Sequence, residues 1–101
     1  ILQPMTVPFF TQTISTRSIR SLGWDKPNPE NNTSSYLSPL APAQSFGHTG
    51  FTGNMVWVDP EQELVYVFLS NRLFPTGGNN AINTTRLRRR IQETIYNSLK
   101  P

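Results

Sequence analysis

Apolar and polar residues follow a strand-like pattern in the second half of the chain. Over residues 54–59 (NMVWVD), Met55 and Trp57 fall on one side of an extended chain and Val56 and Val58 on the other. Residues 64–71 (LVYVFLSN) are apolar almost throughout, as in a strand covered on both faces. The polar stretch between them begins with Asp-Pro, which suits a hairpin turn. The pattern therefore predicts two antiparallel strands joined by a short turn.

A helical pattern follows near the C-terminus. Apolar residues recur there every four positions and form one stripe of an amphipathic helix over residues 82–99: Leu87, Ile91, Ile95 and Leu99. Asn83 or Thr84 can cap the N-terminus of this helix. We expect the helix to lie across the apolar face of the hairpin, because neither element can bury its surface alone. The predicted fold class is therefore α+β, an antiparallel sheet covered by a C-terminal amphipathic helix.

The rest of the chain is expected to be less regular. Residues 1–22 predict a short helical turn near two prolines and then a strand that runs into residues 21–24. Residues 25–44 are rich in Pro, Asn and Ser and predict a long, irregular surface loop. A chain of 101 residues is the size of one domain, so we expect residues 1–101 to form a single unit.

Composition and charge exclude several kinds of site. The chain has no cysteine, which rules out disulfides and thiolate nucleophiles, and its single histidine offers no paired metal-ligand spacing, so we expect no metal and no cofactor. A net charge of +3 accompanies a basic run at residues 85–90 (TRLRRR). Without interleaved aromatic residues, this run is typical of a solvated helix face rather than of a nucleic-acid site. No apolar run approaches the roughly 18 residues that span a membrane.

The single histidine, His48, lies in a glycine-rich segment, residues 45–53 (SFGHTGFTG). A histidine beside hydroxyl groups can carry a proton or present a cation to an anionic substrate. Gly47, Gly50 and Gly53 recur every third residue, and glycine lets a ligand or a backbone approach closely. The alternative is that His48 is an exposed turn residue without a chemical role, and residue types alone favour that alternative.

The order of these motifs resembles that of a known family. The sequence has HTGFTGN at residues 48–54, then VDP, then an apolar strand that ends in LSNR and a C-terminal amphipathic helix. This order is similar to the last part of the serine β-lactamase and penicillin-binding-protein superfamily. LGW at residues 22–24 is similar to its class C-like branch, which includes esterases and D-aminopeptidases. Residues 45–72 would then be the active-site strand and hairpin.

This resemblance implies roles for five residues. His48, Thr49 and Gly50 would form the third active-site motif, where the family usually has lysine in place of the histidine. His48 would assist proton transfer or attract a substrate carboxylate, Thr49 would bind that carboxylate, and the backbone N–H of Phe51 would be an oxyanion donor. Gly50 would keep the strand edge clear for substrate, and Thr52 would lie beside it in the substrate site. Histidine in place of lysine favours peptidase or esterase chemistry over efficient β-lactam hydrolysis.

The chain carries no nucleophile of that family. Ser-x-x-Lys is absent, since Gly23 and Asn97 precede the two lysines at the required spacing, and Tyr-x-Asn is absent as well. We therefore expect the C-terminal piece of a bacterial periplasmic or envelope serine hydrolase that acts through an acyl-enzyme. Its substrates would be peptides, esters or β-lactam-like molecules. The piece would be inactive without the upstream remainder of its domain.

Other interpretations stay open. A non-catalytic module of the same fold, appended for example to a glycoside hydrolase, could bind the cell wall or a partner through Trp24, Phe51 and Trp57, although the alternating strand favours Trp57 in the core. A nucleic-acid binder would depend on the basic run alone. A sheet without its upstream strands would expose an edge, so a homodimer through that edge is also expected.

Overall fold

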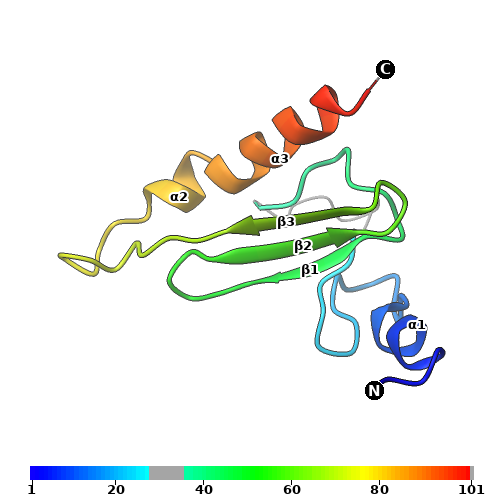
Figure 1. Ribbon diagram of the computed structural model, residues 1–101. Helices are drawn as coiled ribbons and strands as arrows, with labels where there is room; N and C mark the ends of the chain where they lie inside the picture. Colours follow the sequence, from blue (N-terminus) through cyan, green and yellow to red (C-terminus); the bar gives the residue numbers. More distant parts are fainter. Residues whose placement is uncertain (28–35, 101) are drawn as a thin grey trace.

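The computed structural model describes residues 1–27 and 36–100, and its elements form an α+β fold. A short helix, α1 (Thr6–Thr11), precedes three strands, β1 (Phe46–Thr49), β2 (Met55–Asp59) and β3 (Leu64–Phe68). Two helices follow, α2 (Ala81–Thr84) and α3 (Leu87–Ser98). The strands form an antiparallel sheet in the order β1-β2-β3 (Figure 1). The fold class predicted from the sequence is therefore confirmed.

The β2–β3 hairpin forms where the alternating pattern predicts it. Trp57 of β2 pairs with Tyr66 of β3. The turn between the strands is held by Asp59, whose Oδ1 accepts the backbone N–H groups of Glu61 (2.9 Å) and Gln62 (3.1 Å). An aspartate that accepts from amides two or three residues ahead mimics a backbone turn. The Asp-Pro signal in the sequence therefore acts through the aspartate side chain.

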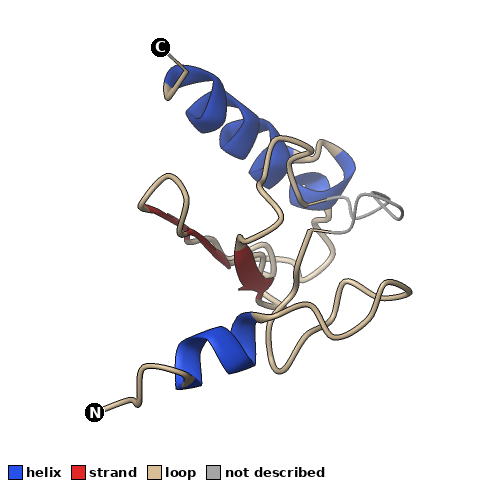
Figure 2. Ribbon diagram, turned by 90° about the vertical axis from the view of Figure 1, so that its right-hand side faces the viewer, coloured by secondary structure: helices blue, strands red, loops and turns tan. Residues whose placement is uncertain are grey.

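The hydrophobic core lies between one face of the sheet and α3. Four buried residues form its centre: Leu37, Met55, Trp57 and Tyr66. Ile91 and Ile95 of α3 pack against this centre, and Figure 2 shows α3 on one side of the sheet and α1 on the other. Trp57 is only 1% exposed, which confirms its predicted place in the core and excludes it from a contact surface.

The opposite face of the sheet is largely open. Val65 and Val67 of β3 are 62% and 56% exposed, because they alternate with buried Tyr66 and face away from α3. Within the described residues β3 is also an edge strand, since β2 is its only neighbour. The prediction that β3 is covered on both faces is therefore wrong for this chain. The apolar composition of β3 does not indicate whether a segment that covers its second face belongs to the same chain.

The helix expected over residues 82–99 is divided in two. α2 and α3 are separated at Thr85 and Arg86, and Arg86 adopts a left-handed conformation with φ of 52°. Arg86 is also the N-cap of α3 and makes no side-chain capping hydrogen bond, so the prediction that Asn83 or Thr84 caps this helix is wrong. No helix in residues 1–27 or 36–100 is long and apolar enough to cross a membrane.

The buried stripe of α3 is displaced by one residue from the predicted one. Its buried residues are Arg88, Gln92 and Tyr96, whereas Leu87 and Leu99 are 36% and 46% exposed. Polar atoms therefore take part in docking α3. The Oε1 atom of Gln92, for example, accepts the backbone N–H of Ser38 at 2.6 Å in a buried contact.

The strand expected before residue 24 does not form. Residues 12–24 contribute only an isolated bridge, in which Arg20 pairs with Asp25. The hydroxyl oxygens of Ser15 and Ser18 accept the backbone N–H groups of Arg17 (3.1 Å) and Arg20 (3.0 Å). Such local hydrogen bonds offer the backbone an alternative to strand pairing, which explains why the Thr- and Ile-rich composition is overridden.

The loop expected over residues 25–44 is not confined to the surface. Asp25 and Lys26 at its start are 1% and 3% exposed, and Leu37 and Ser38 are both 3% exposed. Leu37 belongs to the core, and Asp25 pairs with β1 through its backbone. The expected surface position is therefore wrong for these four residues, although residues 36–44 form no helix or strand. Residues 28–35 of the expected loop lie outside the described residues.

Candidate active-site wall

Strand β1 presents one backbone edge away from β2. On that outer edge, the N–H of Gly47 donates to the carbonyl of Asp25 (3.0 Å) and its carbonyl accepts the N–H of Asp25 (2.7 Å). On the β2 side, the N–H of Gly50 donates to the carbonyl of Asn54 (2.8 Å). Because backbone groups alternate between the two edges of a strand, those of Thr49 face the outer edge, as those of Gly47 do.

The turn over residues 19–26 lies beside this edge. It is closed by the N–H of Lys26, which donates to the carbonyl of Ile19 at 2.7 Å, and Gly23 supplies the positive φ of 86° within it. The Trp24 ring packs edge-on against Phe46 of β1, with 5.2 Å between ring centroids. Residues of the LGW motif therefore shape this turn and anchor it to β1.

His48 makes polar contacts with that turn. Its Nε2 lies 2.5 Å from Nη1 of Arg20, and its Nδ1 lies 2.7 Å from the carbonyl oxygen of Thr49. Nη1 of Arg20 also lies 3.0 Å from Oδ1 of Asp25, whose Oδ2 accepts the hydroxyl of Tyr36. His48 is therefore a half-buried strand residue in a network of four polar side chains, and not an exposed turn residue.

Thr49, Gly50 and Phe51 lead from β1 into the turn before β2. Thr49 pairs with Met55, which places its side chain on the α3 face of the sheet. Phe51 is 76% exposed, its carbonyl accepts Nε of Arg72 (2.7 Å), and its ring centroid lies 4.9 Å from the Arg72 guanidinium carbon. Within the described residues, the N–H of Phe51 donates to no acceptor.

A hollow of about 290 Å³ opens beside this turn, and Arg72 and Arg88 line it. Arg88 is only 6% exposed; its Nη1 donates to the carbonyl of Gly53 (3.2 Å) and its Nη2 to Oδ1 of Asn83 (2.6 Å). Its Nε has no partner among the described residues, and no carboxylate there forms an ion pair with either arginine. Burial lowers the pKa of Arg88, but a guanidinium stays charged at any ordinary pH.

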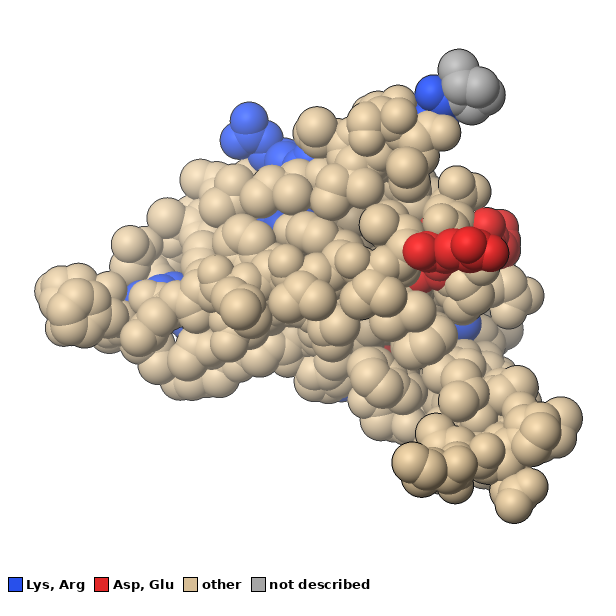
Figure 3. Space-filling model, in the orientation of Figure 1, with Lys and Arg blue, Asp and Glu red and all other residues tan. Residues whose placement is uncertain are grey.

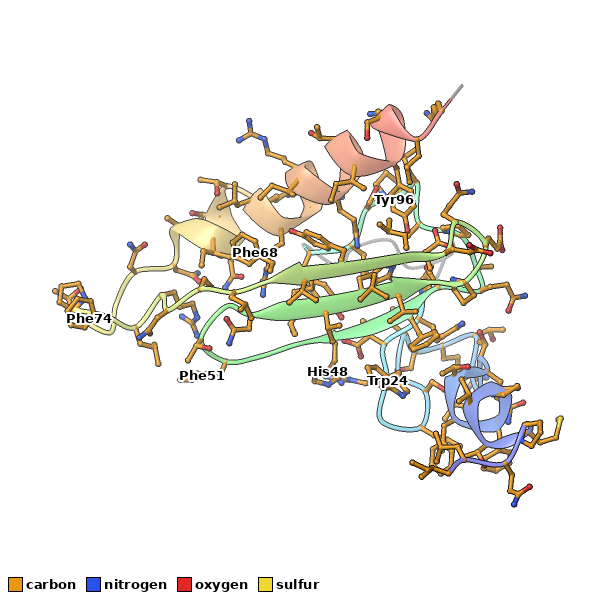
Figure 4. The ribbon with its side chains drawn as sticks, viewed as in Figure 1. Trp24, His48, Phe51, Phe68, Phe74 and Tyr96 are labelled. Atoms are coloured by element: carbon orange, nitrogen blue, oxygen red, sulfur yellow. The ribbon has the colours of Figure 1, made fainter. Side chains whose placement is uncertain are left out.

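The structure separates the sequence-predicted residues into two groups. Thr49, Gly50 and Phe51 border the arginine-lined hollow, whereas the His48 side chain lies on the opposite face of the sheet with Arg20. Figure 4 shows His48 and Trp24 on one side of the sheet and Phe68 and Tyr96 on the other.

Thr52 has a supporting place in the turn. It is half-buried, and its carbonyl accepts the N–H of Arg72 (3.0 Å) and the hydroxyl of Ser70 (3.2 Å). These two bonds tie the turn after β1 to the segment that follows β3. Thr52 therefore holds the wall of the hollow in place through its backbone.

Sequence reasoning missed the charged residues on both faces. Arg88 was expected on a solvated face, and a polar stripe repeating every four residues, Arg88, Gln92 and Tyr96, was the signal that could have corrected this. Arg20 had no such signal, because 28 residues separate it from His48. Among residues 1–27 and 36–100, no group of three or more His, Asp or Glu residues could hold a metal ion.

Comparison with known families identifies the family of the chain. The family model Beta-lactamase matches residues 2–89, which include all three strands and the start of α3. The chain therefore belongs to the Beta-lactamase family, and so to the serine β-lactamase and penicillin-binding-protein superfamily that its motifs resemble.

Two similar proteins carry the name "Putative D-alanyl-D-alanine carboxypeptidase". The one from Salmonella gallinarum (strain 287/91 / NCTC 13346) is 32% identical over 78 residues, which is 77% of this chain and 18% of that protein. The one from Escherichia coli (strain K12) is 34% identical over 67 residues, 66% of this chain and 15% of that protein. The chain thus spans less than a fifth of the length of these relatives. No solved structure is significantly similar to it.

Proposed function

We propose that this chain is the C-terminal part of a bacterial serine hydrolase of the periplasm or cell envelope, which cleaves amide or ester bonds through an acyl-enzyme. One observation carries the proposal: a chain in the Beta-lactamase family spans only 15% to 18% of relatives named as D-alanyl-D-alanine carboxypeptidases. Because the chain contains no Ser-x-x-Lys, the nucleophile and its base come from the upstream remainder of the longer protein. The chain alone is inactive, since an oxyanion donor without a nucleophile gives little rate.

In this proposal the end of β1 forms one wall of the catalytic cleft. The N–H of Phe51, which donates to no acceptor among the described residues, is available to donate to a developing oxyanion. The outward-facing N–H of Thr49 is available to pair with an extended substrate, as an added strand would, while its carbonyl oxygen lies 2.7 Å from Nδ1 of His48. Gly50 is exposed beside them, and the nearest atom to an added Cβ would be 3.6 Å away, so the wall stays open at this point.

The substrate class that we propose carries a carboxylate, which enters the hollow beside Thr49. Arg72 and Arg88 have no carboxylate partner in the described part of the chain, and Nε of buried Arg88 has no hydrogen-bond partner there. A buried charge is more stable when its donors are satisfied and it is paired with an opposite charge. A substrate carboxylate would complete the hydrogen bonding of these guanidinium groups, for which arginine geometry is well suited.

A kinetic comparison tests this substrate class. In the longer protein, we expect Arg72→Gln to raise KM about tenfold for a peptide or depsipeptide with a free C-terminal carboxylate, because one charge-assisted hydrogen bond is lost. The KM for the corresponding amide should change little. Arg90→Gln removes an exposed charge from α3 and is the matched control. Equal changes in KM for the acid and the amide would contradict the proposed carboxylate site.

Intact-mass spectrometry tests the acyl-enzyme itself. The longer protein and the 101-residue chain are each incubated with a penicillin and then with a serine-reactive phosphonate. We expect a covalent adduct on the longer protein and none on this chain. An adduct on this chain would contradict the assignment of the nucleophile to the upstream part.

A non-catalytic module is the second candidate, because Phe51 is 76% exposed and the chain carries no nucleophile of the family. Such a module would bind the cell wall or a partner through the aromatic surface at Phe51. Failure of both reagents to label the longer protein would favour this candidate over the hydrolase.

A further inference from the structure

In the network around His48, one guanidinium nitrogen of Arg20 donates to the imidazole and forms an ion pair with Asp25, whose Oδ1 accepts no hydrogen bond among the described residues. Nη1 of Arg20 lies 2.5 Å from Nε2 of His48 and 3.0 Å from Oδ1 of Asp25. Asp25 is 1% exposed and is itself held by the Tyr36 hydroxyl and by backbone hydrogen bonds to Gly47. The carboxylate therefore fixes the place of the guanidinium, and the guanidinium fixes the imidazole.

The Arg20 side chain is 59% exposed, yet its backbone is not free to move away. Arg20 and Asp25 form a backbone bridge across the turn that Trp24 anchors to Phe46. The contact between Arg20 and His48 is therefore held in place by the turn and by buried Asp25, rather than by burial of the Arg20 side chain. This distinguishes it from a surface ion pair between two mobile side chains, which contributes little.

The hydrogen-bond partners assign the proton of the imidazole. Arginine has donors only, so Nε2 of His48 accepts from Arg20, and in the neutral ring the proton then lies on Nδ1. Nδ1 donates to the carbonyl of Thr49 at 2.7 Å, which fixes the ring plane. From this geometry we propose that Arg20 is a positioning residue for His48, which holds its imidazole in the Nδ1–H tautomer and occupies Nε2.

This inference deepens the proposed function, on which it rests for the place of β1 in the wall of the catalytic cleft. With Nε2 occupied, His48 is not a free base, and its role is to orient the Thr49 carbonyl at the outer edge of β1. The permanent positive charge on this face belongs to Arg20, because a guanidinium stays charged where an imidazole alone is mostly neutral at pH 7.

Nitrogen NMR of the single histidine tests the proposal in the 101-residue chain. With ¹⁵N-labelled histidine at about pH 9, where imidazoles are neutral, we expect one-bond proton coupling at Nδ1 and none at Nε2. Loss of a hydrogen bond from a charged donor in Arg20→Ala should shift the tautomer ratio toward Nε2–H by about tenfold or more. Arg20→Lys keeps a charged donor and should retain the Nδ1–H form.

Arg17→Ala is the matched control, because it removes an exposed arginine from the same segment without touching the network. It should leave the tautomer unchanged. The proposal is overturned by an Nε2–H ring in the unsubstituted chain, by an unchanged ratio in folded Arg20→Ala, or by the same shift in Arg17→Ala. Should Arg20→Ala fail to fold, the tautomer of His48 in the unsubstituted chain and in Arg20→Lys still tests the proposal. The readout needs no catalysis, so its failure is distinct from a failure to detect an acyl-enzyme.

Discussion

The three glycines around His48 serve different purposes. A Cβ on Gly47 would overlap the carbonyl oxygen of Val56 and the ring of Trp57, and Gly53 takes a positive φ of 99°. Gly50 has neither constraint, since its nearest neighbour would be the Cβ of Asn54 at 3.6 Å. The three glycines, although they recur every third residue, therefore do not share one structural role. Only Gly50 is left without a structural reason, which agrees with a role in leaving room for a ligand.

The difference between two of these glycines is testable by unfolding. We expect Gly47→Ala to lower the free energy of unfolding by about 2 kcal/mol or more, because overpacking displaces Trp57 from the core. Gly50→Ala should change it by less than about 0.5 kcal/mol, as exposed substitutions usually do. Urea denaturation followed by tryptophan fluorescence measures both. A similar loss in the two variants would contradict the packing role assigned to Gly47.

At the level of elements, the junction between α2 and α3 places a residue other than glycine in a left-handed conformation. Arg86 adopts φ of 52°, a left-handed conformation that is unfavourable for residues with a Cβ. Thr85 contributes to the break, since its hydroxyl donates to the carbonyl of Ala81 at 2.6 Å. The apolar repeat in the sequence does not predict this break, because it shows which residues are apolar and not where the backbone changes direction.

Glycine substitution should act in opposite directions at two arginines near this junction. Arg86→Gly is expected to raise the free energy of unfolding by up to about 1 kcal/mol, because glycine adopts the left-handed conformation without a steric penalty. Arg90→Gly, at an exposed position within α3, should lower it by about 1 kcal/mol through loss of helix propensity. Thermal unfolding monitored by circular dichroism compares them. Destabilisation by both would show that the left-handed arginine is not under strain.

The whole molecule has one covered and one open sheet face. α3 covers the face that carries Trp57 and Tyr66, while Val65 and Val67 remain exposed on the other and β3 has a free edge among the described residues. The surface in Figure 3 is mostly uncharged, with few Lys, Arg, Asp or Glu side chains across it. Exposed apolar edge strands tend to pair with another chain.

We therefore expect the 101-residue chain by itself to self-associate. Sedimentation velocity over a concentration series should show a dimer, and Val67→Lys should shift the equilibrium toward the monomer by placing a charge on the open face. Thr94→Lys, at an exposed position on α3, is the control and should have no effect. A monomer at every concentration, or an equal effect of the two lysines, would contradict association through β3.

Several features could be predicted from the sequence because their causes are local. The β2–β3 hairpin depends on alternation and on the bonds that Asp59 makes two and three residues ahead. The C-terminal helix depends on a repeat of four. The strand at residues 46–49 was indicated only by the family resemblance, since the residue types alone favoured an exposed turn for His48. The order of motifs was also sufficient to indicate the Beta-lactamase family.

Only the tertiary structure decided which charged groups meet. His48 and Thr49 are adjacent in sequence but lie on opposite faces, where His48 contacts Arg20 and Thr49 borders the hollow of Arg72 and Arg88. Arg20 reaches His48 across 28 residues through a turn anchored by an aromatic contact. The sequence by itself determined the elements and the family, since periodicity and turn chemistry act over a few residues. The partners of each charge depended on packing between distant segments, which no local pattern encodes.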